Sequence, residues 1–475
     1  MKRAAIPLLA LATSACALGP KSPTTAISLP PPANAATIPS AAGPAQQVVP
    51  GAAVRADWWR LFDAPLLDAL VDRALAANND LATAEANLRQ ARQQAAATAG
   101  ASLPQIDAGY QAQRIRTSRT LSNPLPDPDQ YLYTLHSAQL SVAYPLDLFG
   151  AQRSKLLSAR AAAEVAQHRL TAAHTTVIAN LVTAVIQQGA LAAQMEAATD
   201  AIHNNRDILH MMKVRQAVGE IGAADVAAQE TALANAEAAL PPLTRQLEHQ
   251  RAVIAMLIGI APGSPLPKLP ALADLTLPDT LPVALPAQIV ANRPDVRAAE
   301  AQMRGAGADV GAAIAARLPS IQLSANIGGE ATRFADMFAT GNPFWALIGG
   351  VTQPIFHGGA LLHQQKAAEA ALEAAKAQYR AAVLQAFADV SDALTGLRTD
   401  AQALDAAARA SDAADRNLGF TRRQLELGSV GTLALLNASA SDAQANAQLV
   451  QAKAARLTDT VALFQAVGGG VAPQR

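Results

Sequence analysis

Two stretches of the chain alternate strictly between apolar and polar side chains. Such period-two alternation is typical of a β-strand with one apolar and one polar face. It predicts strands at residues 103–116 and 318–330, and weaker alternation predicts partner strands at 131–145 and 344–353. The apolar positions of the two clear strands are Ile106, Ala108, Tyr110 and Ala112, and Ile321, Leu323, Ala325 and Ile327. The chain therefore has two hairpins, each with one face suited to lipid.

Helical sequence surrounds both hairpins. A helix of about 30 residues is predicted before each hairpin, at Pro65–Thr98 and Ala287–Ala316, and a much longer one after it, at Ala151–Val218 and Ala360–Leu427. At about 1.5 Å per residue, either long helix would extend about 100 Å. A turn containing Gly follows each, and a further helix returns through residues 246 and 451. Helices of this length suit a tube of coiled-coil type or a spacer across a wide compartment.

The two halves of this plan are copies of one another. Asp80–Glu85 resembles Asp295–Glu300, 215 residues later, whereas Pro145 and Pro354 are 209 residues apart. A net deletion of six residues in the second hairpin loop explains the change of spacing. The predicted fold class is mainly α with a small membrane β part, and its two-fold internal repeat is helix–β-hairpin–long helix–helix.

The N-terminus resembles an export signal. Lys2 and Arg3 precede a short apolar run, and small residues lead to Cys16, the only cysteine of the chain. An incidental cysteine in a signal peptide is one interpretation. We favour a bacterial lipobox, in which cleavage leaves Cys16 as an acylated N-terminus, although Thr13 stands where Leu is usual. No other cofactor is expected.

Composition divides the rest of the chain. Proline-rich and alanine-rich sequence cannot bury a core, so residues 16–54 are predicted to form a lipidated N-terminus and an extended tether. The predicted organisation is a signal peptide at 1–15, the tether at 16–54, repeat 1 at 55–261, a Pro-rich linker at 262–286, repeat 2 at 287–467 and a tail at 468–475.

Charge and motifs exclude several classes of function. The 37 basic residues equal the 37 acidic ones in number, so nothing favours nucleic acid as a partner. The sequence has no Gly-rich phosphate loop, no Cys/His metal cluster and no nucleophile elbow, so we expect no enzyme. His203 and His210 are interpreted as surface residues. No run of about 18 uninterrupted apolar residues occurs, which leaves the strands to cross a membrane.

Four strands cannot close a barrel, and open sheet edges are not tolerated in lipid. The smallest membrane barrels have about eight strands. A dimer would supply eight and a trimer twelve, so oligomerisation is required but its order is left open by this argument.

Four further motifs occur in the chain, at Asp57–Asp63, Asn78–Leu81, Leu146–Gly150 and Asn292–Glu300. In this order, and together with the internal repeat, they resemble the outer-membrane factors of tripartite efflux pumps of the RND type, the TolC-like family, and in particular its NodT-type lipoproteins. The resemblance extends from Cys16 to about residue 470. It implies a homotrimer with a 12-strand β-barrel in the outer membrane, above a periplasmic α-barrel of the 12-helix type. It also implies export of small toxic compounds with a periplasmic adaptor (membrane fusion) protein and an inner-membrane efflux transporter.

The resemblance also suggests functional residues. The turns at Gly219 and Gly428 correspond to the tips where an adaptor docks, although each is also an ordinary turn between helices. Asp225 and Leu433 correspond to residues of the periplasmic gate, and Asn437 stands where Asp is usual, which implies a less charged gate. A solvated surface acid is the alternative interpretation of Asp225.

Two other functions share part of this pattern. A secretion conduit for proteins would have the same fold, and the lipobox favours efflux instead. A purely structural periplasmic adaptor would have helical hairpins, but it needs no amphipathic strands in lipid.

Overall fold

The computed structural model describes residues 36–52, 54–118, 120, 131–284 and 286–469. The chain divides into two compact units. Of the described residues, the first unit comprises those within 88–166 and 299–379. The second unit comprises those within 36–87, 167–298 and 380–469. Cys16, with the predicted signal peptide, lies outside the described residues.

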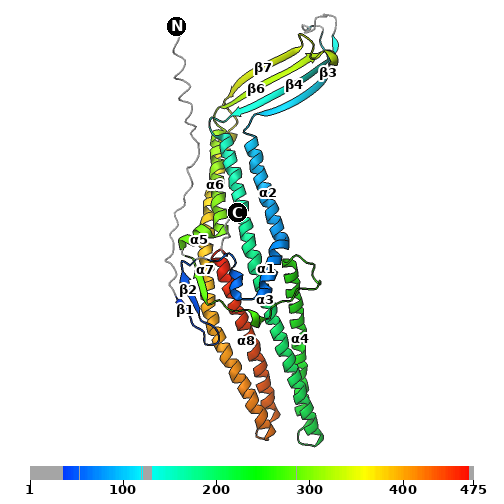
Figure 1. Ribbon diagram of the computed structural model, residues 1–475, viewed down its shortest axis with the longest axis vertical. Helices are drawn as coiled ribbons and strands as arrows, with labels where there is room; N and C mark the ends of the chain where they lie inside the picture. The colour runs from blue at the N-terminus through cyan, green and yellow to red at the C-terminus, as the bar shows by residue number, and fades with distance from the viewer. Residues whose placement is uncertain (1–35, 53, 119, 121–130, 285, 470–475) are drawn as a thin grey trace. The chain divides into compact units, whose positions relative to one another are not determined.

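A four-stranded antiparallel sheet forms the β part of the first unit, in the order β3-β4-β6-β7 (Figure 1). Its strands are β3 (Gln105–Arg116), β4 (Leu132–Leu146), β6 (Ser320–Ala331) and β7 (Pro343–Thr352). All four predicted strands are confirmed to within two residues at each end. The hairpins of the two repeats join through β4 and β6, so β3 and β7 are the edges.

The register confirms that the sheet is amphipathic. Ala108 pairs with Leu140, Leu140 with Ile327, and Ile327 with Trp345, so one apolar row crosses all four strands. The neighbouring row contains Asp107, Ser141, Asn326 and Ala346. Three members of the apolar row remain exposed, at 44% for Leu140, 60% for Ile327 and 76% for Trp345. One face of the sheet therefore has a large exposed apolar surface.

Helices of both repeats support the sheet within the first unit. They are the C-terminal part of α2 (Asn79–Gly100), α6 (Pro294–Ala315), and the N-terminal parts of α3 (Ala151–Ala217) and α7 (Ala360–Glu426). Packing of α6 against α7 buries the cluster Met303, Val310, Leu372 and Ala375. All four helices join the strands at the same end, and the hairpin loops lie at the other end.

The second unit contains the remaining helical sequence. The return helices are α4 (Ala223–Leu257) and α8 (Thr432–Ala466), and α1 (Pro65–Ala77) and α5 (Pro286–Asn292) are shorter. Trp58 is fully buried and stacks on Phe464 at 5.2 Å between ring centroids. The Trp58 motif therefore contributes core packing.

The prediction of one unbroken helix before each hairpin is wrong. The first breaks at Asn78, whose side-chain oxygen accepts hydrogen bonds from the N–H groups of Asp80 (2.9 Å) and Leu81 (3.1 Å). A side chain that bonds these N–H groups caps a new helix, so α1 ends and α2 begins there. The second breaks at Arg293, before the proline that begins α6.

Arg293 fixes the second break in place. Its side chain is 8% exposed and donates to the Asp295 and Asp389 carboxylates at 2.7 and 2.8 Å and to the Ala466 carbonyl at 2.9 Å. Burial raises the pKa of Asp295, but the Arg293 guanidinium outweighs this and leaves that pKa below its usual value. The motif at Asn292–Glu300 thus forms a structural junction.

The predicted tether is also corrected where the structure describes it. Residues 36–38 (β1) and 46–50 (β2) pair with each other, and β2 pairs in parallel with β5 (Thr280–Val283) of the predicted linker. Ile38, Val48 and Leu281 are buried. Backbone pairing and a few apolar side chains are sufficient for order here, despite the proline content.

Within the part of the chain that the structure describes, one helix meets the length and hydropathy requirements of a membrane span. An 18-residue window of α3 has a mean hydropathy of 1.4, although no uninterrupted apolar run occurs. Of this window, 61% is buried inside the protein, as in the core helix of a soluble protein. Composition alone therefore gives only weak support for a helical membrane span.

Candidate functional site: the helical hairpin tips

The first helical hairpin ends in a tight turn centred on Gly219. Its φ of +79° lies in the left-handed region, where a side chain would be strained. The Gly219 N–H donates to the Gln216 carbonyl (3.0 Å) and the Glu220 N–H to the Arg215 carbonyl (3.0 Å). These two bonds define a Schellman motif, which satisfies carbonyls left free at the end of α3.

The second hairpin tip repeats this geometry. Gly428 has a φ of +69°, and its N–H donates to the Leu425 carbonyl (3.1 Å). The Ser429 N–H donates to the Gln424 carbonyl at 2.9 Å. The two predicted tips are thus equivalent in backbone structure, which confirms that each is a turn and leaves adaptor docking a prediction.

A shared apolar core lies beneath the two tips. It combines side chains of α3, α4, α7 and α8, so the two hairpins support each other at this level. The buried members are Ile208, Met212, Val226, Leu418, Leu425, Leu435 and Ala438.

Asp225 links the two hairpins by its carboxylate. One oxygen accepts from the N–H of Gly222 at the start of α4 (3.2 Å), and the other accepts from the hydroxyl of Thr432 at the start of α8 (3.2 Å). A carboxylate in the first turn of a helix is also stabilised by the helix dipole. The Asp225–Thr432 bond was not foreseen, because nothing in the sequence pairs these two positions.

Leu433 and Asn437 project from the exposed side of α8, one turn apart. Leu433 is 67% exposed, whereas Leu435 on the opposite side is 1% exposed. Both predicted gate residues line a groove of about 790 Å³ between α8 and the α3–α4 hairpin, which we call the tip groove. The structure therefore brings Leu433 and Asn437 together, while Asp225 does not line the tip groove.

Charged side chains lie outside the tip groove. The 20 described residues that line it are mainly alanines and amides, and none carries a charge. Arg206 pairs with Glu237 at 2.6 Å, and Lys213 with Glu230 at 2.9 Å, between α3 and α4. The lining of the tip groove is therefore uncharged, and its role as a gate stays a prediction.

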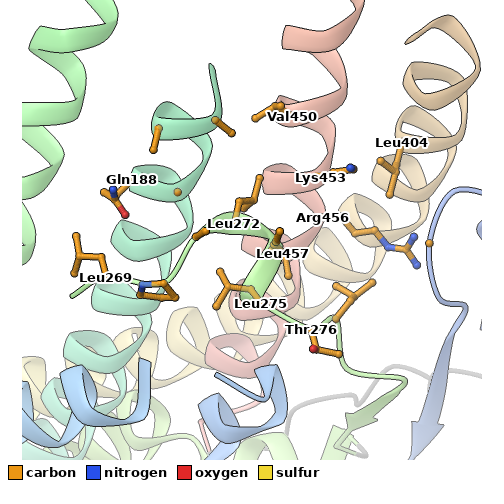
Figure 2. A pocket seen from close by; sticks show the side chains of 18 of the residues that line it. Gln188, Leu269, Leu272, Leu275, Thr276, Leu404, Val450, Lys453, Arg456 and Leu457 are labelled. Atoms are coloured by element: carbon orange, nitrogen blue, oxygen red, sulfur yellow. The ribbon is translucent and has the colours of Figure 1, made fainter. Parts of the chain in front are cut away.

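A second hollow of about 690 Å³ lies further along the same helices (Figure 2). The loop residues Leu269, Leu272 and Leu275 form its apolar part, together with Leu457 of α8. Arg456 borders it and is 1% exposed. The Arg456 side chain donates to the Pro44 carbonyl (2.8 Å) and the Gln46 side chain (3.3 Å), which ties the β2 segment to α8.

Two carboxyl groups meet between α7 and α8. Burial, and then the nearby Asp459, raise the pKa of Asp400 to about 6. Burial likewise raises the pKa of Asp459. Gly396 makes room for the pair, since a Cβ there would collide with the Asp459 carboxylate. The spacing of Gly396 and Asp400 on one helix is the only sequence signal that could have indicated this pair.

Metal chemistry finds no support within the described part of the chain. No group of three or more His, Cys, Asp or Glu residues there could hold a metal ion. The Nε2 atom of His203 lies 3.5 Å from Asp207 on an exposed helix face, in agreement with its interpretation as a surface residue.

Fold and site together define a class: an outer-membrane channel protein with an amphipathic sheet and periplasmic helices. Residues 70–260 and 285–469 match the family of outer membrane efflux proteins, once for each repeat. The chain belongs to this family. It is a non-enzymatic transport conduit of the outer membrane, as its sequence predicted.

Named relatives agree with this assignment. The chain is 31% identical over 419 residues to the pyoverdine export outer membrane protein OpmQ of Pseudomonas putida, covering 87% of this chain and 88% of the relative. It is 30% identical over 312 residues to the toluene efflux pump outer membrane protein TtgF of P. putida, covering 64% of this chain and 62% of the relative.

Solved structures show the same fold. The outer-membrane channel OprN superposes with a TM-score of 0.85 at 27% identity, covering 96% of this chain and 99% of that one. The open state of the MtrE channel of Neisseria gonorrhoeae gives 0.79 at 26% identity, covering 94% and 98%.

Proposed function

We propose that three copies of this chain form a conduit through the outer membrane, which exports small compounds as part of a tripartite efflux pump. This proposal rests mainly on the four-stranded sheet. Its edge strands β3 and β7 each pair with one neighbour, and their outer sides pair with no other described strand of the chain. Unpaired backbone groups are not tolerated in lipid, so β3 of one copy pairs with β7 of the next. Three copies would close a barrel of twelve strands.

The two faces of the sheet support this arrangement. The apolar row through Leu140, Ile327 and Trp345 faces lipid, and the row through Asp107, Ser141 and Asn326 faces the channel. Relatives are named for the export of pyoverdine, toluene and solvents, and we propose that this chain likewise exports small compounds.

The tip groove forms the periplasmic entrance in this proposal. Leu433 from three copies narrows the pore by apolar contact, and Asn437 contributes amide hydrogen bonds one turn further on. The Asp225–Thr432 bond holds the two hairpins of each copy together beside this ring. Opening requires the hairpins to part, so the bond favours the closed entrance.

Adaptor docking is assigned to the turns at Gly219 and Gly428. Both present backbone with no side chain, and for neither would an added Cβ meet a neighbour within 4 Å. An adaptor could therefore approach the turns closely. The inner-membrane transporter would supply the energy.

A lipid on Cys16 is the remaining part of the proposal. Acyl chains there would hold the N-terminus in the inner leaflet of the outer membrane. Mass spectrometry of the mature N-terminus should find an acylated Cys16. An unmodified Cys16, or cleavage elsewhere, would remove the anchor from the proposal and leave the barrel intact.

Single-channel recording in a planar bilayer tests the entrance. Leu433→Ala should raise the conductance, because it removes most of the apolar side chain from the ring. Leu427→Ala is the matched control, since Leu427 is 82% exposed and follows the end of α7. Unchanged conductance for Leu433→Ala, or an equal rise in the control, would exclude Leu433 from the gate.

The link between hairpins has its own test. Thr432→Val keeps the shape of the side chain but cannot donate to Asp225, so the open fraction should rise. Thr231→Val is the control, because the Thr231 hydroxyl bonds only to the carbonyl of Ala227 within α4. Equal gating of the two variants would show that the Asp225–Thr432 bond does not hold the entrance closed.

A further inference from the structure

An aromatic cluster lies at the loop end of the sheet, away from the helices of the first unit. The Tyr110 hydroxyl lies 2.7 Å from Nδ1 of His136, and the two rings stack at 6.1 Å. Phe334, from the β6–β7 loop, packs edge-on against both rings at 5.7 and 6.1 Å. Two of the three rings remain exposed, at 54% for Tyr110 and 62% for Phe334.

The register assigns the cluster to the apolar face of the sheet. Tyr110 pairs with Ala138 and Ala112 with His136, so Tyr110 and His136 are diagonal neighbours on one face. Ala108 and Leu140 of the apolar row belong to the same face. The cluster therefore borders lipid.

A groove of about 600 Å³ adjoins the cluster on this face. Ala108, Tyr110, Leu140 and Ile327 form its floor, and Phe338 from the β6–β7 loop forms a wall. The β6–β7 loop lies close to strand β6 because residue 329 is glycine, since a Cβ there would collide with the backbone of residue 337. An apolar groove of this volume suits an acyl chain.

Basic side chains continue the same face toward the loops. Arg114 pairs across the strands with Thr134, to which its guanidinium donates at 2.9 Å, and Arg116 follows on the same face. Arg333, next to Phe334, is 82% exposed. Among the residues described at this end of the apolar face, the one acid is Asp336, which lies 3.7 Å from Arg333. The described part of the rim therefore has three basic side chains and one acidic one, which is a positive excess.

We propose that this site binds a phosphorylated glycolipid of the outer leaflet, the lipid A part of lipopolysaccharide. An acyl chain lies in the groove, and a phosphate contacts Arg114 and Arg116 by charge-assisted hydrogen bonds. The loop end of the sheet is opposite the helices of the first unit, so in the proposed barrel it faces the outer leaflet, where lipid A carries its phosphates. Charge complementarity and the adjoining groove select this lipid. The site rests on the proposed barrel, because only a membrane-spanning sheet exposes it to the outer leaflet.

The aromatic cluster has a structural role in this site. It joins the β6–β7 loop to the β3–β4 hairpin and so holds the groove wall in place. Aromatic rings are also typical of the interface between the apolar core and the headgroups of a membrane.

The test compares lipids on the purified full-length protein in detergent, by native mass spectrometry with lipid A, phosphatidylglycerol and phosphatidylethanolamine. Lipid A should be retained at least tenfold more strongly than either phospholipid. The double variant Arg114→Gln, Arg116→Gln should lose at least tenfold in lipid A retention, and Ala108→Phe, which fills the groove, should lose a similar factor. Arg153→Gln with Lys155→Gln is the control, because it removes the same charge at the start of α3, where the sheet meets the helices.

The outcomes separate this inference from the proposed function. Equal retention of phosphatidylglycerol and lipid A, or equal loss in the control variant, would overturn the lipid A site. Wild-type protein that fails to insert into vesicles as an oligomer would instead overturn the barrel.

Discussion

The Asp400–Asp459 pair makes the stability of the protein depend on pH. The folded-state pKa of Asp400, about 6, exceeds its ordinary value of 3.8, because burial and Asp459 oppose its charge. Between pH 3.8 and about 6, Asp400 is therefore protonated in the folded protein and deprotonated in the unfolded chain. The contribution of Asp400 to stability falls as the pH rises from about 4 to about 6, and this contribution does not change further at higher pH.

The size of the effect follows from the shift. One pKa unit corresponds to about 1.4 kcal/mol, so deprotonating Asp400 costs the fold at most about 3 kcal/mol. Partial exposure of the pair to solvent reduces this to about 1–2 kcal/mol. Asp400→Asn removes the charge but keeps a group that donates to Asp459. We expect it to raise the melting temperature at pH 7.5 by about 1–2 °C, since the unfolding entropy of a chain of this length is about 1 kcal/mol per degree, and by much less at pH 5.

Thermal melting of the helical circular dichroism signal, at one scan rate in detergent, measures this difference. Asp412→Asn is the control, since Asp412 lies on the same helix, is exposed and pairs with Arg416 at 3.0 Å. An equal shift of the Asp400→Asn melting temperature at both pH values, or a lower one at pH 7.5, would show that the Asp400 charge does not destabilise the fold.

Three further substitutions test the packing around the channel helices. Gly259→Ala should prevent folding or lower expression sharply, because the φ of Gly259 is +73° and a Cβ there would collide with the Ala77 carbonyl. Gly263→Ala is the control, since Gly263 also has a positive φ but an added Cβ would lie in open space, and it should lower expression much less in the same assay. Arg456→Met should lose its bond to the Pro44 carbonyl and release residues 36–50, which faster hydrogen exchange there would report; unchanged exchange would contradict this. Gly428→Ala should cost about 1 kcal/mol at the left-handed turn and increase protease cleavage at the second tip, and an unchanged cleavage rate would argue against strain there.

Local pattern was sufficient to predict the sheet. Strand alternation depends only on side chains two residues apart, so the apolar positions of β3, such as Ile106 and Ala108, could be identified directly from the sequence. The long helices α3 and α7 were also predicted to within one residue at each end. Their ends are marked by glycines, whose conformational freedom is a local property.

Features that depend on distant partners were missed. Asn78 resembles an ordinary helix residue until its amide is seen to donate to the Leu257 carbonyl at 3.0 Å, 179 positions away. The ordered part of the tether depends on Arg456 and on β5, neither of which is near it in sequence.

The candidate site was predictable only in part. Family resemblance singled out Leu433 and Asn437, and the structure brings them to one groove. The Asp225–Thr432 bond required the two repeats to be folded together, 207 positions apart, so no local pattern could indicate it.

The number of chains in the assembled protein tests the central claim most directly. Native mass spectrometry of protein extracted from the outer membrane should give three times the mass of the mature chain, since three sheets of four strands close the barrel. A stable monomer or dimer as the only species would contradict the trimeric conduit.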